Sequence, residues 1–159
     1  MLILTEENKL QIKEHALREN PNECCGLFIE NMGVLELENK SKTPAESFII
    51  DYNTLKKAEK YGRIKGFYHS HPEDEFSNID NLISEKRMLS SVIYKIKEDS
   101  FSVYNPVGLE IPYVGREFVM GIFDCFTLVQ EYYLRERNIK IPDFIHKYRY
   151  TEDISLTEI

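Results

Sequence analysis

Few cysteines, few basic residues and no long hydrophobic run set the first limits on this chain of 159 residues. Its three cysteines, Cys24, Cys25 and Cys125, are too few for a disulfide framework, so we expect a reducing compartment. Lys and Arg number 20 against 27 Asp and Glu, which gives a formal net charge of -7. Because no basic run is dense enough to hold phosphates, nucleic acid is not an expected partner.

The hydrophobic residues are spread along the chain in short runs. None approaches the roughly 20 apolar residues that are needed to cross a bilayer, so no membrane partner is expected. Only three consecutive apolar residues follow Met1, which is too few for a signal peptide. With 42% hydrophobic and 30% charged residues, the composition is that of a globular chain, and its length predicts one domain with at most a small appendage.

Apolar spacing and turn residues predict an α/β fold in which helices flank a mixed sheet. Thr5 is the expected cap of a first helix that ends near Asn20. The turn residues at 31–33 predict a hairpin between the two strands on either side of them. Further helices are expected at 53–63, 77–89 and 124–137, and strands at 24–29, 33–37, 47–50, 64–68, 91–96 and 101–104.

A change in composition after residue 104 predicts a domain boundary. The run NPVGLEIPYVGR contains two prolines and two glycines, which is typical of a connection. We therefore expect a domain at 1–104, a linker at 105–115 and a short, mostly helical segment at 116–159. That last segment is too short to form an independent core.

Two of the four histidines, His69 and His71, stand two residues apart where a strand is expected to end, so their side chains face the same side. Asp80 lies one helical turn after Ser77, from where its carboxylate can return to the strand end. Two imidazoles and one carboxylate leave a fourth position for water, as in catalytic zinc sites, although iron and manganese also accept such ligands. The alternative is that both histidines are ordinary polar residues of a surface loop.

These residues resemble a family signature. The run H-S-H-P followed by S-x-x-D, with Glu23 upstream in P-x-E-x-C-G-L, resembles the JAMM (JAB/MPN-type) metallopeptidases. The resemblance implies a cytidine deaminase-like α/β fold with Zn²⁺ held by His69, His71 and Asp80. It also implies that Glu23 is the proton shuttle in hydrolysis of an amide bond, and that Ser77 hydrogen-bonds the oxyanion. The alternative for Glu23 is a surface charge that precedes a strand.

The loop after the second histidine departs from the family pattern. Five residues, PEDEF, separate His71 from Ser77, where the family has seven. The shorter loop is acidic, so Asp74 is an alternative third ligand. We prefer Asp80 because the expected helix register turns its side chain toward the histidines.

The C-terminal segment carries a second resemblance. Residues 115–144 resemble the opening of an NlpC-type papain-like cysteine peptidase domain, in which D-C-x-x-L begins the nucleophile helix. Cys125 is the matching nucleophile, and its alternative is an ordinary helix residue. The only downstream histidine, His146, follows too closely to act as its base. We therefore expect this segment to be catalytically incomplete, because the chain is truncated or because a partner supplies the rest.

A JAMM-like domain followed by an NlpC-like segment is similar to the siphophage tail assembly proteins of the lambda tail protein K type. This likeness implies phage tail proteins as partners, peptides of peptidoglycan or a tail protein as substrate, and a location in the host cytoplasm during assembly or in the virion tail. The leading hypothesis is a zinc peptidase of a phage tail. The alternatives are an isopeptidase of ubiquitin-like proteins and a structural tail component with an inactive site.

Overall fold

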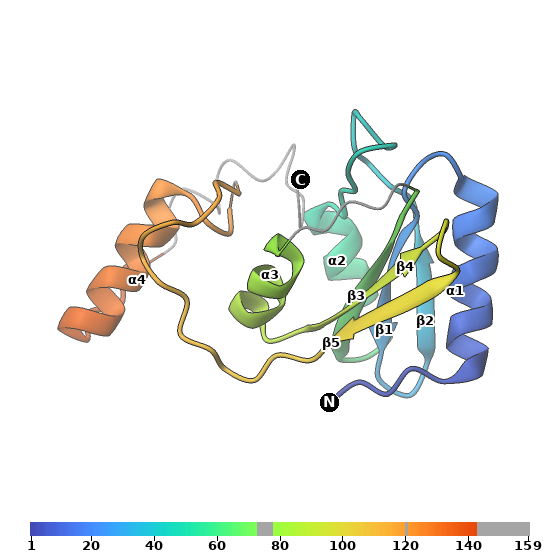
Figure 1. Ribbon diagram of the computed structural model, residues 1–159. Helices are drawn as coiled ribbons and strands as arrows, with labels where there is room; N and C mark the ends of the chain where they lie inside the picture. Colours follow the sequence, from blue (N-terminus) through green and yellow to red (C-terminus); the bar gives the residue numbers. More distant parts are fainter. Residues whose placement is uncertain (73–77, 120, 143–159) are drawn as a thin grey trace.

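A computed structural model describes residues 1–72, 78–119 and 121–142 of the chain. It has three layers: helix α1 covers one face of a five-stranded sheet, and helices α2 and α3 cover the other (Figure 1). Helix α4 lies beyond α3, on the side away from the sheet. The predicted α/β class, with a mixed sheet, flanking helices and a helical C-terminal segment, is confirmed.

The strands are arranged in the order β2-β1-β3-β4-β5. The predicted hairpin is formed by β1 (Cys25–Ile29) and β2 (Gly33–Leu37), and β1 also pairs antiparallel with β3 (Ile64–His71). The next strand, β4 (Ser90–Lys95), runs parallel to β3, and β5 (Ser100–Tyr104) returns antiparallel at the edge. A parallel pair needs a crossover connection, which α3 supplies.

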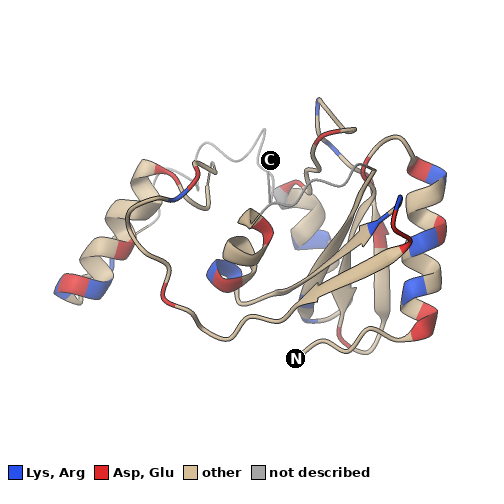
Figure 2. Ribbon diagram, viewed as in Figure 1, with Lys and Arg blue, Asp and Glu red and all other residues tan. Residues whose placement is uncertain are grey.

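The four helices are α1 (Glu6–Glu19), α2 (Tyr52–Ala58), α3 (Ile79–Arg87) and α4 (Cys125–Arg137). The predicted cap of α1 is confirmed, since the Thr5 side chain accepts from the backbone of the third helical residue. Acidic and basic residues are interspersed along α1 (Figure 2). Within the described residues, none of the helices has the length and apolar character to cross a membrane.

The alternation of side chains along β3 divides the buried residues into two cores. Tyr68 packs on the α1 side, and Phe67 packs on the side of α2 and α3. Because side chains alternate along a strand, His69 and His71 lie on the same side as Phe67. The α1 core contains Ile12, Ala16, Phe28 and Val92, and the opposite core contains Leu27, Ile50, Ala58 and Ile83.

Several predicted elements differ from the structure, among them β3, which continues to His71 where 64–68 was predicted. Residues 47–50 form neither strand nor helix, although Phe48 and Ile50 are buried. The Asn39 side chain bonds backbone groups of this segment, so they are not available to a ladder. The helix predicted at 53–63 ends at Ala58, because the chain turns into β3 through Gly62, whose φ is +150°.

Helix α3 begins later than predicted. Its N-cap is Asn78, for which the described residues show no side-chain capping bond, and Ile79 is its first residue. The predicted cap, Ser77, lies outside the described residues. At the other end of the helix, Met88 adopts a left-handed conformation with φ of +53° and directs the chain into β4.

The chain after β5 is attached to α3 and to the core. Glu85 of α3 accepts hydrogen bonds from the backbone nitrogens of Val107, Gly108 and Leu109 at 2.8–2.9 Å. Further along, Ile111, Val119, Ile122 and Phe123 join the core on the α2 and α3 side of the sheet. An ion pair between Lys86 and Glu131 then joins α3 to α4. The domain limits at 104 and 115 stay a prediction.

Candidate metal centre

The three predicted metal ligands converge at the junction of β3 and α3. His69 and His71 end the strand, and Asp80 lies in the first turn of the helix. One ligand atom from each lies within 4.8 Å of the others. The two histidine Nε2 atoms are 2.9 Å apart, and the Asp80 Oδ2 is 3.7 Å from the Nε2 of His69. Ligand atoms of a tetrahedral zinc ion are about 3.3 Å apart, so the two spacings bracket that value.

The electrostatics of this cluster suit a bound cation. His69 is 1% exposed and Asp80 is fully buried. Burial raises the pKa of Asp80 to about 7, and burial together with the neighbouring His71 lowers the pKa of His69. Among the described residues, neither Asp80 oxygen nor the His69 Nδ1 has a hydrogen-bond partner. An unsatisfied buried polar atom costs about 1–3 kcal/mol, and a divalent ion satisfies a carboxylate in this position.

The His69 ring is held by stacking. The ring of Phe48 lies 4.5 Å away between centroids at 25°, and the ring of Phe67 lies 6.5 Å away at 13°. Phe48 is itself 1% exposed and comes from the segment that connects β2 to α2. Stacking therefore fixes the plane of the His69 imidazole before any ion binds, so this candidate ligand is preorganised.

Glu23 lies beside the histidines in the register of the sheet. Cys25 is directly opposite His69 in the antiparallel pair of β1 and β3. The pairing continues one residue further, because Ser70 donates its backbone N–H to the Cys24 oxygen at 3.1 Å. Glu23 immediately precedes this pairing, just before β1 begins, at the end of the strand that lies beside the histidine end of β3. Glu23 is 7% exposed, so the alternative of a surface charge is wrong, while its catalytic role stays a prediction.

Two residues of the predicted site lie outside the described part of the chain. Ser77, the predicted oxyanion donor, is one, and Asp74, the alternative third ligand, is the other. Of the two candidate acids, Asp80 is the one that the described structure brings to the histidines.

The three cysteines fall into two environments. Cys24 and Cys25 are buried, one in each core. Cys125 is exposed at the first position of α4, whose N-cap Asp124 accepts from the backbone of Thr127 at 2.8 Å. The downstream His146 lies outside the described residues. The role of Cys125 as a nucleophile stays a prediction.

Sequence reasoning missed two residues around the site. Phe48 is part of an apolar run that we interpreted as a strand, so its position against His69 was not expected. Asn39 had no local signal, since an asparagine after a strand is common in loops. Its importance comes from contacts with residues far along the chain, which only the folded structure shows.

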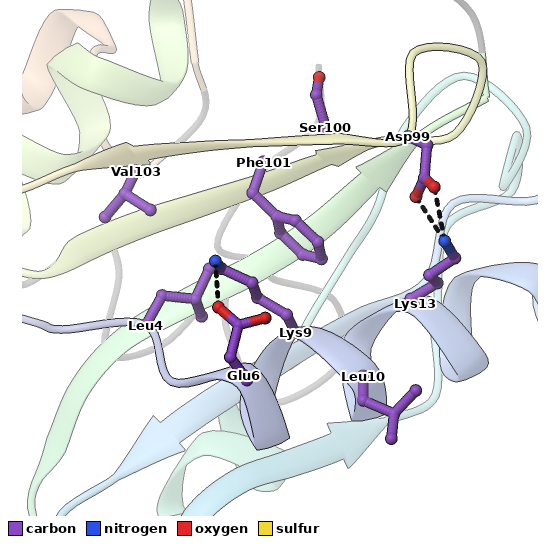
Figure 3. A pocket seen from close by; sticks show the side chains of 9 residues that line it. All are labelled: Leu4, Glu6, Lys9, Leu10, Lys13, Asp99, Ser100, Phe101 and Val103. Atoms are coloured by element: carbon purple, nitrogen blue, oxygen red, sulfur yellow. Dashed lines mark hydrogen bonds and ion pairs between the residues drawn. The ribbon is translucent and has the colours of Figure 1, made fainter.

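A groove of about 690 Å³ lies between α1 and the edge strand β5 (Figure 3). Apolar side chains of Leu4, Leu10, Phe101 and Val103 line it, and the ion pair of Lys13 with Asp99 lies at one end. Phe101 packs with the α1 core, whereas the candidate ligands are on the opposite face of the sheet. The groove is therefore not part of the metal centre.

Comparison with known proteins gives one family and one curated relative. The model of a family described as prokaryotic homologs of the JAB domain matches residues 5–105. The "Tail tip assembly protein K" of Escherichia phage N15 is 31% identical over an alignment of 147 positions, which covers 89% of this chain and 60% of that protein. The chain thus spans about three fifths of the length of this relative.

Two solved structures have a similar chain path. One is a solution structure of a protein from Desulfitobacterium hafniense, with a TM-score of 0.47 and 24% identity, covering 67% of this chain and 92% of that one. The other is the crystal structure of a JAB1/MPN domain protein from Archaeoglobus fulgidus, with a TM-score of 0.40 and 20% identity, covering 65% of this chain and 87% of that one.

Proposed function

Since the chain belongs to the prokaryotic homologs of the JAB domain, we propose that it is a zinc-dependent peptidase that hydrolyses an amide or isopeptide bond. The observation that carries the proposal is the convergence of donor atoms from His69, His71 and Asp80 within 4.8 Å. Three protein ligands of this kind leave a fourth position for water, which distinguishes catalytic from structural zinc sites.

The residues around the donors have complementary tasks. When bound, zinc supplies Lewis acidity that polarises the scissile carbonyl and makes a nearby water more acidic. Glu23 takes the proton of the attacking water and later passes it to the leaving amine, a task usually worth about 10²- to 10⁴-fold in rate. Its burial, just before the strand that pairs with the histidine end of β3, supports this assignment. Ser77 donates a hydrogen bond to the developing oxyanion, which the family signature supports.

The biological setting that we propose is the phage tail. The relative from phage N15 is named as a tail tip assembly protein, and the match extends over most of this chain. We propose that this chain acts with phage tail proteins during assembly, in the host cytoplasm or in the virion tail. Its substrate in this setting is a peptide crosslink of peptidoglycan or a bond in a tail protein.

The proposal is tested by metal analysis and two substrates. The purified chain is expected to retain about one zinc per molecule and to cleave purified peptidoglycan, with cleavage lost on chelation and restored by zinc. A fusion of a ubiquitin-like protein serves as the second substrate. Cleavage of that fusion alone would assign the isopeptidase function instead. If the chain retains no stoichiometric metal and cleaves neither substrate, the remaining hypothesis is a structural tail component with an inactive site.

A further inference from the structure

The Asn39 side chain makes four hydrogen bonds of 2.9–3.0 Å and a fifth, longer one of 3.5 Å to the Pro44 oxygen, all to backbone atoms. Its Nδ2 donates to the oxygens of Glu23 and Ser47, both at 2.9 Å. Its Oδ1 accepts from the nitrogens of Ser41 at 2.9 Å and Ile49 at 3.0 Å. An asparagine amide has two donor hydrogens and two acceptor lone pairs, so this side chain is saturated.

The partners of Asn39 belong to two parts of the chain beside the candidate metal centre: the segment around Phe48, and Glu23. Ser47 and Ile49 are the residues immediately before and after Phe48, whose ring stacks on His69 at 4.5 Å. The third partner is the backbone oxygen of Glu23. The contact between Glu23 and this segment is reinforced by a 2.7 Å bond from the Glu23 nitrogen to the Pro44 oxygen. One amide therefore joins the backbone of the proposed base to the ring that holds a proposed ligand.

The segment between β2 and α2 has few backbone pairings of its own. Residues 38–51 contain neither helix nor strand. Within them, backbone bonds run from the Lys40 nitrogen to the Ile49 oxygen and from the Glu46 and Ser47 nitrogens to the Thr43 oxygen. Without the Asn39 amide, the Ser47 oxygen and the Ile49 nitrogen lose their side-chain partner, while the bonds from the Ser47 nitrogen to the Thr43 oxygen and from the Lys40 nitrogen to the Ile49 oxygen remain. Water then competes for these groups.

We infer that Asn39 is a positioning residue, which fixes Phe48 against His69 and the Glu23 backbone beside it. The inference deepens the proposed function, because it rests on His69 as ligand and Glu23 as base. Residues that orient metal ligands typically change metal affinity or activity by about 10- to 100-fold when they are replaced. Asn39 acts here through the ring and the backbone, and does not itself touch a ligand in the described contacts.

The test begins with Asn39→Asp in the full chain. This substitution keeps the acceptors for Ser41 and Ile49 but removes the donors and sets a carboxylate against two carbonyl oxygens. In the metal-free protein, we expect the His69 ring protons to lose the upfield NMR shift that stacking on Phe48 causes, and the Glu23 amide to exchange faster. Zinc affinity, measured by chelator competition, is expected to fall about 10- to 100-fold.

Two further variants make the test specific. Ser41→Ala is the matched control: it removes the 2.6 Å contact between the Ser41 and Ser47 hydroxyls but keeps every Asn39 bond, so zinc affinity stays within twofold. Phe48→Leu keeps the Asn39 bonds and removes the stacked ring. We expect Phe48→Leu to lower zinc affinity as Asn39→Asp does. In the variant that combines both substitutions, the fold loss of zinc affinity is expected to be smaller than the product of the two single fold losses.

The outcomes separate the two proposals. If folded Asn39→Asp keeps the His69 shift and wild-type zinc affinity, Asn39 only shapes the loop and the inference is overturned. If Asn39→Asp does not fold, Phe48→Leu decides, since unchanged zinc affinity in that variant overturns the inference as well. If the wild type binds no zinc while Asn39→Asp loses the His69 shift, the proposed function fails and the positioning role of Asn39 stands.

Discussion

The Asp80 carboxylate lies 3.7 Å from the Nε2 of His69, and both side chains are 1% exposed. The two residues belong to different elements, since the histidine ends a strand and the acid begins a helix. The helix dipole favours a negative charge in that first turn. Burial of the Asp80 charge without a cation costs free energy, however. A bound metal ion would balance that charge.

Asp80→Asn is expected to lower zinc affinity by at least about 100-fold, because the amide keeps the shape of the carboxylate and removes its charge. Chelator competition measures the affinity. Asp99→Asn is the matched control, since Asp99 is an exposed aspartate paired with Lys13 of α1, the helix that covers the other face of the sheet. Equal zinc affinity in Asp80→Asn and the wild type would contradict Asp80 as a ligand.

Zinc is expected to stabilise the folded chain. A ligand that binds only the native state adds about 2.7 kcal/mol to the unfolding free energy at 100 times its Kd. Thermal unfolding followed by circular dichroism, with zinc and then with excess chelator, measures the difference. The shift in Tm should be present in the wild type and absent in Asp80→Asn. A similar shift in both proteins would place the zinc elsewhere.

Glu23→Gln is expected to lower kcat by about 10²- to 10⁴-fold and to leave zinc content unchanged, because the amide cannot carry the proton. Turnover of the substrate found in the peptidoglycan and fusion assays is the measurement. Glu30→Gln, at an exposed position after the same strand, is the control. Full activity of Glu23→Gln would assign the proton transfer to another group.

In the native protein, one of the three thiols is expected to react with a thiol reagent such as DTNB. Cys125 is exposed, whereas Cys24 and Cys25 are buried. Burial raises the pKa of Cys24 to about 12 and raises that of Cys25 as well, so both remain protonated and unreactive. All three thiols should react in guanidinium chloride. If a second thiol reacted rapidly with DTNB in the native state, the region around β1 would have to open readily.

Glu85→Gln is expected to destabilise the chain by about 2 kcal/mol at pH 7, as is usual for lost hydrogen bonds to a charged group. Burial opposes the charged form of Glu85, yet hydrogen bonds from Tyr104 and three backbone nitrogens lower its pKa. A pKa lowered by folding contributes stability above the unfolded-state value, and this contribution is lost as the pH falls through the folded-state value.

Urea unfolding of the wild type and Glu85→Gln at several pH values measures this contribution. The difference between the two midpoints should be largest near neutral pH and should shrink below the ordinary glutamate pKa of about 4.3. Glu98→Gln, in the exposed turn between β4 and β5, is the control. A difference that does not depend on pH would mean that shape, and not charge, holds the segment at 107–109.

The residues of the candidate metal centre were predictable because their geometry is local. The spacing of His69 and His71 fixes their common face, and Asp80 follows within one loop and one helical turn. Phe48 was predicted to lie in a strand, because a short apolar run alone does not distinguish a ladder from a buried loop. In the structure, backbone groups of this segment bond to the Asn39 side chain and not to a neighbouring strand. The spacing of residues along the chain does not predict such contacts.

Helix α3 has nine residues, with Asp80 in its first turn and Lys86 in its last. The rise along a helix is 1.5 Å per residue, so only about 9 Å separates the proposed ligand from the ion pair with α4. One short helix therefore carries both the candidate ligand and the ion pair that joins it to α4, so a displacement of α4 would pull on the helix that presents Asp80.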